Sequence, residues 1–227
     1  MASQPINSAI GSTISKKIIM ALTGLFLVFF VIVHMTGNLS FIFGGSDAFN
    51  TYSHTLISLG PLLYVVEIGL LAAFLLHAWN AISISRHNRN ARPDGYKKLK
   101  STGAPSKRSS SSMTMIWTGI ILLVFTAIHL KTFKYGAIYT TTVNGTEMRD
   151  LYRLVAEVFK SPIYTWGYVA TMLLLGFHLR HGFWSAFQSL GANHPRYSNL
   201  IYTIGVVLAV VLTFGFLAVP LTVYFSG

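Results

Sequence analysis

Four histidines lie inside long apolar stretches of this chain, one in each stretch: His34, His77, His129 and His178. An imidazole in hydrocarbon is costly unless it has a partner, so intramembrane histidines indicate a functional site. Two sites with two histidines each would hold two haem b groups, with the four histidines as ligands of the haem iron. The alternative is that each histidine only hydrogen-bonds to a neighbouring helix.

The composition predicts an all-α membrane protein. Of the 227 residues, 52% are hydrophobic and 10% are charged, and the mean hydropathy is +0.56, unlike an ordinary soluble domain. A helix needs about 20 apolar residues to cross a bilayer. We therefore predict one transmembrane cytochrome b domain over residues 1–227, a five-helix bundle with helices near 18–43, 61–84, 113–133, 162–185 and 199–224.

The chain contains no cysteine. This excludes iron–sulfur clusters held by thiolates, covalently attached c-type haem and disulfides within the chain. The start, with Lys16 and Lys17 before an apolar run, resembles a signal peptide. The run continues to about residue 43 without a small-residue cleavage pattern, so we expect a retained first helix.

The net charge of +11 is concentrated in one segment. Residues 85–112 hold eight Lys or Arg and one acid, whereas the 44–60 loop holds no Lys or Arg. The positive-inside rule then places the N-terminus and the basic loop 85–112 in the cytoplasm, and five crossings place the C-terminus and the 134–161 loop outside. Anionic lipid or an acidic protein surface is a better partner for this loop than nucleic acid.

The expected orientation gives each histidine a depth. His34 and His129 each lie 16 residues from the inner ends of their helices, roughly 24 Å at the α-helical rise. His77 and His178 each lie seven residues from inner ends, roughly 10 Å. The sequence therefore predicts an outer pair, His34 with His129, and an inner pair, His77 with His178, separated by roughly 14 Å. The fifth predicted helix carries no histidine and is expected to serve in packing.

Small residues follow two of the histidines on the same helix face. Gly37 lies three residues after His34, and Gly182 lies four after His178. Glycine at these positions would leave room for a porphyrin, but it is also common where two helices pack.

Glu67 is the only acid within a predicted span. It lies ten residues before His77, roughly 15 Å nearer the outside and close to the level of the outer pair. A carboxyl there suits proton transfer to a quinone or a hydrogen bond to its carbonyl. The alternative is a protonated glutamate bonded to a neighbouring helix.

Other polar residues have several interpretations. Lys131 and Arg180 each follow a predicted ligand by two residues, and their long side chains would reach haem propionates or lipid phosphates. His181 shares a face with His178, which makes it a rival ligand or a propionate contact. The remaining histidines, His54, His87 and His194, fall in predicted loops and are expected to be solvated.

Four segments carry a resemblance to a known family: V-H-M-T-G-N around His34, E-I-G-L-L-A-A-F-L-L-H-A around His77, A-I-H-L-K-T-F around His129, and G-F-H-L-R-H-G-F-W-S-A-F-Q-S-L-G around His178. The chain resembles the di-haem cytochrome b anchor of succinate:quinone oxidoreductases (succinate dehydrogenase and fumarate reductase), the single-anchor type with five helices. The most specific segment is the last, with its H-x-x-x-G-[FL]-W-S pattern.

The resemblance implies the reaction. In that family the matching histidines are the axial haem ligands, and the match favours His178 over His181. A flavoprotein with covalent FAD would oxidise succinate, so this chain alone would not. An iron–sulfur subunit, docked on the 85–112 side, would pass electrons through two haems to a quinone, and the resemblance implies menaquinone. The implied location is a bacterial inner membrane, with a higher oligomer of the complex as an option.

Two other functions remain open from the residues. A cytochrome b anchor of another respiratory dehydrogenase would use the same haem geometry. A haem-free transporter would use intramembrane histidine and glutamate as a proton relay, although no inverted repeat is detectable.

Overall fold

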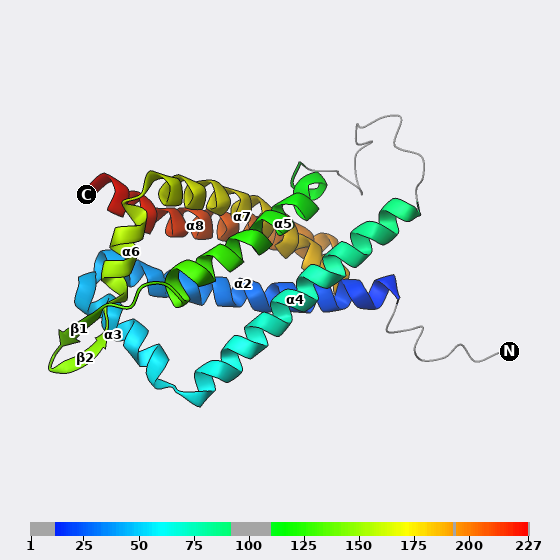
Figure 1. Cartoon of the computed structure of the whole chain (residues 1–227). Coiled ribbons are helices and arrows are strands. Elements are labelled where there is room, and N and C mark those ends of the chain that lie inside the picture. Colours follow the sequence, from blue (N-terminus) through cyan, green and yellow to red (C-terminus); the bar gives the residue numbers. More distant parts are fainter. Residues whose placement is uncertain (1–11, 92–109, 193, 227) are drawn as a thin grey trace.

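The computed structural model describes residues 12–91, 110–192 and 194–226. Five long helices run between the two ends of the molecule (Figure 1). They lie close to the five predicted stretches and extend beyond most of them: α2 (Thr13–Phe43), α4 (Pro61–Asn90), α5 (Ser110–His129), α7 (Pro162–Ser189) and α8 (Pro195–Ser226). Most of the basic loop 85–112 lies outside the described residues, but its first residues continue α4.

Four of these helices are long and apolar enough to cross a membrane: α2, α4, the segment Thr114–Lys134 and α8. Within their most apolar windows, between 6% and 39% of residues are buried inside the protein. Large apolar side chains such as Phe29, Trp79 and Phe214 are more than 60% exposed. Since this surface is unfavourable in water, it belongs against lipid, and the chain is an all-α membrane protein.

The fifth long helix, α7, has 28 residues but is not among these four. Its buried residues include Thr165, Tyr168 and Thr171, which lower its mean hydropathy. The helix packs against α2, α5 and α8, so these three side chains are covered by protein rather than by lipid. Five spans therefore stay a prediction.

Local chemistry explains where the helices begin. Ser12 caps α2 by accepting a hydrogen bond from the Ser15 N–H. Pro61 and Pro162 open α4 and α7 at the first helical position, where a missing N–H costs nothing. The chain of α5 continues directly into a π-helix, η1 (Leu130–Lys134), so this element extends one turn beyond His129.

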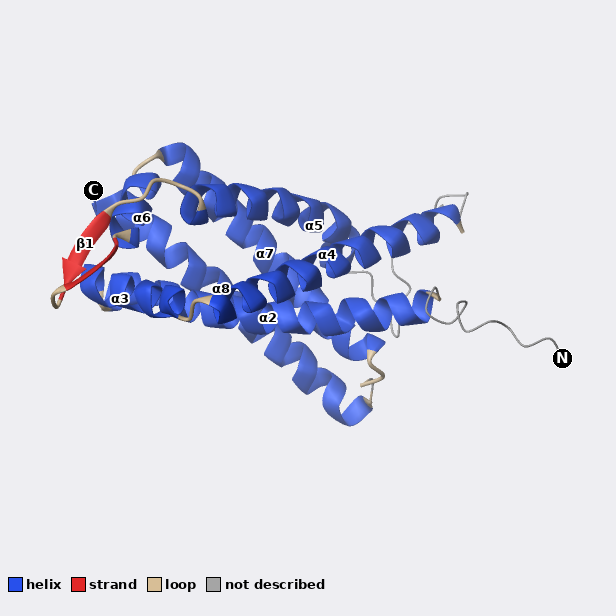
Figure 2. Ribbon diagram, turned by 60° about the horizontal axis from the view of Figure 1, so that its bottom comes forward, coloured by secondary structure: helices blue, strands red, loops and turns tan. Residues whose placement is uncertain are grey.

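Two segments that we expected to be loops are folded. Residues 44–60 contain α3 (Gly45–Ser58), and residues 134–161 contain β1 (Thr140–Val143), β2 (Thr146–Arg149) and α6 (Leu151–Phe159). The strands pair antiparallel, with Thr140 opposite Arg149 and Val143 opposite Thr146. All these elements lie together at one end of the bundle, where the chain also ends (Figure 2).

A buried polar contact joins α3 to the start of α6 within this end cap, which consists of α3, β1, β2 and α6. Asn50 of α3 is 1% exposed. Its side-chain amide donates to Asp150 Oδ1 at 2.9 Å, and its oxygen accepts from the Tyr152 N–H at 2.9 Å. Aromatic residues surround this contact, including Phe41 of α2, whose ring stacks on Tyr152 at 4.1 Å between centroids. The cap is therefore a packed part of the fold.

Candidate functional site

The outer pair of histidines meets between α2 and α5. The rings of His34 and His129 have centroids 5.8 Å apart and are perpendicular to each other. His34 also stacks on Phe30 and contacts Phe216, and His129 lies near Phe125. Apolar rings thus enclose two imidazoles at this level.

The inner pair meets between α4 and α7. The rings of His77 and His178 have centroids 6.4 Å apart and an interplanar angle of 63°. The structure therefore brings together the same two pairs of histidines that were predicted from their depths along the helices. Whether these pairs hold haem iron stays a prediction.

Hydrogen bonds orient both inner histidines. His77 Nδ1 lies 3.1 Å from the Met20 carbonyl oxygen, which can only accept, so Nδ1–H is the donor. His178 Nδ1 lies 3.1 Å from Thr118 Oγ1. The Thr118 hydroxyl is within reach of the Thr114 and Met115 carbonyls, so it donates there and accepts from His178. Both Nε2 atoms are left without a proton, which is the state that binds a metal.

Tyr168 of α7 contacts the outer pair in a similar way. Its hydroxyl lies 3.3 Å from His129 Nδ1 and comes from the helix that carries His178. Met20, Thr118 and Tyr168 are not among the site residues predicted from the sequence. A hydroxyl residue in an apolar span is a visible signal for the last two, whereas a backbone carbonyl leaves no signal.

These donor sets fit haem. A metal–imidazole bond is about 2 Å, so two imidazoles on opposite sides of one metal have centroids roughly 6 Å apart, close to both observed pairs. Among the described residues, no group of three or more His, Cys, Asp or Glu could hold a bare metal ion. A porphyrin supplies four nitrogens itself and needs only two axial ligands, which matches a two-histidine set.

The glycines that face the inner pair differ from the expected ones. A Cβ on Gly24 would lie 3.1 Å from His77 Cε1, and one on Gly119 would lie 3.6 Å from His178 Cε1. Gly37 instead faces the ring of Tyr52 on α3, and Gly182 faces Met115. The contacts of Gly37 and Gly182 therefore favour the alternative interpretation, close packing of helices. Helix rotation relative to neighbours cannot be obtained from spacing alone.

Glu67 forms an ion pair with Lys134 at the end of η1. Both side chains remain about one-third exposed, at 32% and 35%. The partner of Glu67 on the neighbouring element is thus a cation, and the role of Glu67 toward a quinone stays a prediction. Lys134 is the first residue of the 134–161 segment that we predict to be an outer loop, and nothing in the sequence indicates this pairing.

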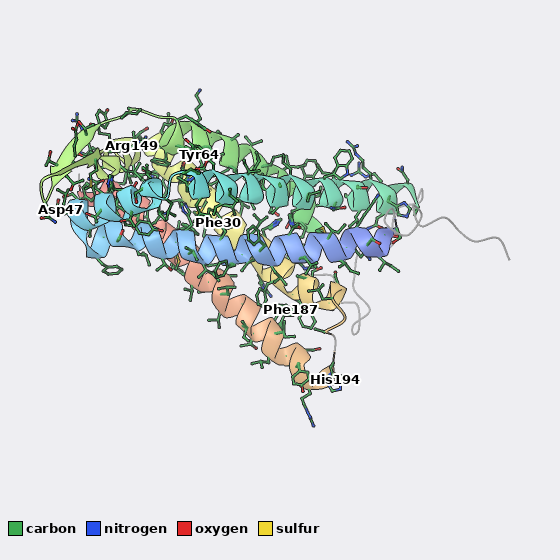
Figure 3. The ribbon with its side chains drawn as sticks, turned by 90° about the horizontal axis from the view of Figure 1, so that it is seen from below. Phe30, Asp47, Tyr64, Arg149, Phe187 and His194 are labelled. Carbon is green, nitrogen blue, oxygen red and sulfur yellow. The ribbon has the colours of Figure 1, made fainter. Side chains whose placement is uncertain are left out.

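Arg149 fixes the end of η1 (Figure 3). Its guanidinium donates to three backbone carbonyls, those of Phe133 at 2.9 Å, Lys134 at 3.3 Å and Ala137 at 3.2 Å. Burial lowers the pKa of this guanidinium, and its Nε has no partner among the described residues. Arg149 therefore holds the turn that carries Lys134.

The remaining candidates lie apart from the ring pairs. Arg180 donates to the Tyr202 hydroxyl of α8 at 2.7 Å, Lys131 is exposed on η1, and His181 is half-buried one turn from His178. Propionate contacts for all three stay predictions. The three histidines expected in solvated loops belong to ordered segments: His54 to α3, His87 to the end of α4, and His194 to the start of α8.

Comparison with known proteins gives one match. A family model described as "Succinate dehydrogenase/Fumarate reductase transmembrane subunit" matches residues 85–217, which is more than half of the chain. Comparisons with curated proteins and with solved structures gave no match. The matched region includes His129 and His178 and most of the fold after α4. The chain therefore belongs to the family of succinate dehydrogenase and fumarate reductase transmembrane subunits, the cytochrome b anchors of these enzyme complexes.

Proposed function

We propose that this chain is the membrane anchor and cytochrome b subunit of a succinate:quinone oxidoreductase, in which it carries electrons between an iron–sulfur subunit and a membrane quinone. The observation that carries the proposal is the meeting of four intramembrane histidines as two pairs, at 5.8 Å and 6.4 Å between ring centroids. Family membership supplies the enzyme complex.

The two pairs would hold two haems b at two depths. On α2, Gly24 faces His77 of the inner pair, and His34 of the outer pair lies ten residues further, roughly 15 Å along the helix. Haem, when bound, supplies one-electron transfer. The protein's part is to present Nε2 of each histidine, to hold the ring orientation through Nδ1, and to exclude water with apolar side chains.

The quinone would bind near Glu67 and Lys134. Reduction of a quinone takes two electrons and two protons. The Lys134 ammonium can donate a hydrogen bond to a quinone carbonyl, and the Glu67 carboxylate can take up a proton and pass it on. An apolar groove of about 600 Å³ lies along the same seam, between α4 residues 72–82 and Leu123 of α5. It begins five residues beyond Glu67, which supports a place for an isoprenoid tail.

The partners follow from family membership. The flavoprotein would hold FAD and oxidise succinate, and the iron–sulfur subunit would dock on the cytoplasmic side, at the loop between α4 and α5. Menaquinone is the proposed quinone, and the bacterial inner membrane is the proposed location, with the N-terminus inside and the C-terminus outside. This chain alone would not oxidise succinate.

A pyridine haemochrome assay with a redox titration of the purified complex tests the proposal. We expect about two haems b per chain that titrate as two components. One haem would mean that one histidine pair only packs the bundle. A colourless complex would overturn the electron-transfer role.

A further inference from the structure

The inner end of the bundle contains a cavity with several hydrogen-bond donors in its lining, which the proposed electron route does not use. It has a volume of about 210 Å³ and lies between the start of α2 and the end of α4. Its lining residues are Ser12, Thr13, Lys16, Ser83, Ile84 and His87. Five of these six side chains can donate a hydrogen bond.

The chemistry of the cavity favours an oxyanion. Lys16 Nζ donates to Ser83 Oγ at 2.8 Å, which joins the two helices and uses one of the three ammonium hydrogens. His87 and the hydroxyls add further donors, and none of the lining residues is acidic. A phosphate group, with its negative charge and several acceptor oxygens, is the ligand class that matches this lining.

The position of the cavity matches the headgroup level of a membrane. Lys16 and His87 lie two and three residues outside the predicted apolar stretches 18–43 and 61–84. The start of α2 and the end of α4, which carry them, lie at the same end of the bundle as the start of α5 (Figure 1). Basic pockets between helices at the cytoplasmic surface bind the head groups of anionic lipids. The depth therefore suits the phosphate of a lipid.

An exposed apolar stripe favours a lipid over free phosphate as the ligand. On α4, Trp79 and Leu76 lie four and seven residues before Ser83, on the same helix face, and are 67% and 49% exposed. This stripe starts one turn from the cavity residue Ser83 and runs toward the membrane centre, so it offers a surface for acyl chains. Inorganic phosphate would gain nothing from it.

We propose that this cavity binds the phosphodiester group of an anionic phospholipid, with Lys16 and Ser83 as its main contacts. Binding there would fix the inner ends of α2 and α4, and these two helices carry Met20 and His77 of the inner histidine site. The proposal does not depend on haem or on the identity of the quinone.

Native mass spectrometry of the delipidated, fully assembled complex tests this site by titration with phosphatidylglycerol. The Lys16→Gln variant should bind its tightest lipid about fivefold more weakly, the effect expected for one lysine near a membrane surface. Lys17→Gln is the matched control, because Lys17 has the same charge, is exposed and does not line the cavity. Haem content should be the same in both variants.

Three results would overturn the proposal. Equal affinities of the two lysine variants would show that only net charge matters. Equal binding of phosphatidylcholine would remove the preference for an anionic lipid, and displacement by an equal concentration of inorganic phosphate would reassign the cavity to free phosphate. If Lys16→Gln fails to assemble, Ser83→Ala keeps the charge and should still weaken phosphatidylglycerol binding relative to Lys17→Gln.

Discussion

The hydroxyl of Thr118 connects a helix backbone to a predicted haem ligand. Thr118 is 4% exposed, and its oxygen accepts from His178 Nδ1–H while its hydrogen points to the carbonyls of the preceding turn. An acceptor on Nδ1 makes the imidazole a more basic ligand and so favours the oxidised iron.

Replacing Thr118 with valine should therefore raise the midpoint potential of the inner haem. We expect a shift of tens of millivolts, since about 59 mV corresponds to a tenfold change for one electron. The outer haem should keep its potential. Thr126→Val is the control, because Thr126 on the same helix donates only to the Leu122 carbonyl. Equal shifts in both variants would contradict a role through His178.

Removal of single histidines should separate the two haems. His34→Ala or His129→Ala should remove the outer haem and leave the inner one, whereas His77→Ala or His178→Ala should do the reverse. The readout is haem content with low-temperature optical spectra of the purified complex. His181→Ala should keep both haems, and loss of a haem in that variant but not in His178→Ala would make His181 the ligand.

Glu67→Gln should slow quinone reduction and leave both haem spectra intact, because the amide keeps the shape of the side chain but cannot pass a proton. Steady-state succinate:quinone activity measures the effect, and we expect a loss of about 10²-fold or more. Lys134→Met removes the partner charge and should mainly raise the KM for quinone. Unchanged turnover in Glu67→Gln would remove this carboxyl from the mechanism.

Some residues of the candidate site can be predicted from the sequence, and others cannot. The four histidines stand out because a costly side chain in hydrocarbon needs a reason, and helix rise alone assigns their depth. Lys134 and Thr118 were not predicted, because their partners, Glu67 and His178, lie 67 and 60 residues away in the sequence. Such contacts depend on how helices rotate and cross, which one sequence does not specify.

Among the elements, the end cap differs most from the sequence prediction, in which its residues form loops. Asn144 and Gly145 both have positive φ, 51° and 79°, and form the two-residue turn between β1 and β2. Asn-Gly is the strongest short-range hairpin signal, so this pair could have been recognised. The long helices were easier to predict, because each apolar run is long enough to cross a bilayer, which takes about 20 residues.

The bond between α3 and α6 should be essential to the cap. Asn50→Leu keeps the size of the side chain but leaves the Tyr152 N–H and Asp150 without their buried partner. We expect a loss of about 1–3 kcal/mol, the usual cost of an unsatisfied buried group. Thermal unfolding of the complex measures it, and Thr55→Val on the exposed side of α3 is the control. Equal stability of the two variants would mean that aromatic packing alone holds the cap.

For the whole molecule, the number of crossings depends on α7. Four helices are apolar enough to span a membrane by themselves, and α7 is not. Several of its polar side chains face the protein: Thr165 is 0% exposed and donates to the Phe159 carbonyl at 2.6 Å. Ile163, Leu173 and Phe177 leave an exposed apolar face for lipid, so the lower mean hydropathy of α7 is compatible with a fifth span.

Cysteine labelling decides both the orientation and the fifth span, and the chain suits it because it contains no cysteine. Single variants Asn88→Cys, Thr142→Cys and Gln188→Cys place a thiol at exposed positions on α4, β1 and α7. With five spans and the basic side in the cytoplasm, a membrane-impermeant maleimide added to intact cells should label T142C alone. Labelling of N88C and Q188C should require permeabilised membranes.

Labelling of N88C and Q188C but not T142C in intact cells would mean that the protein has the opposite orientation in the membrane. Labelling of T142C together with Q188C would mean that α7 does not cross, and it would leave His178 without a membrane span to carry it.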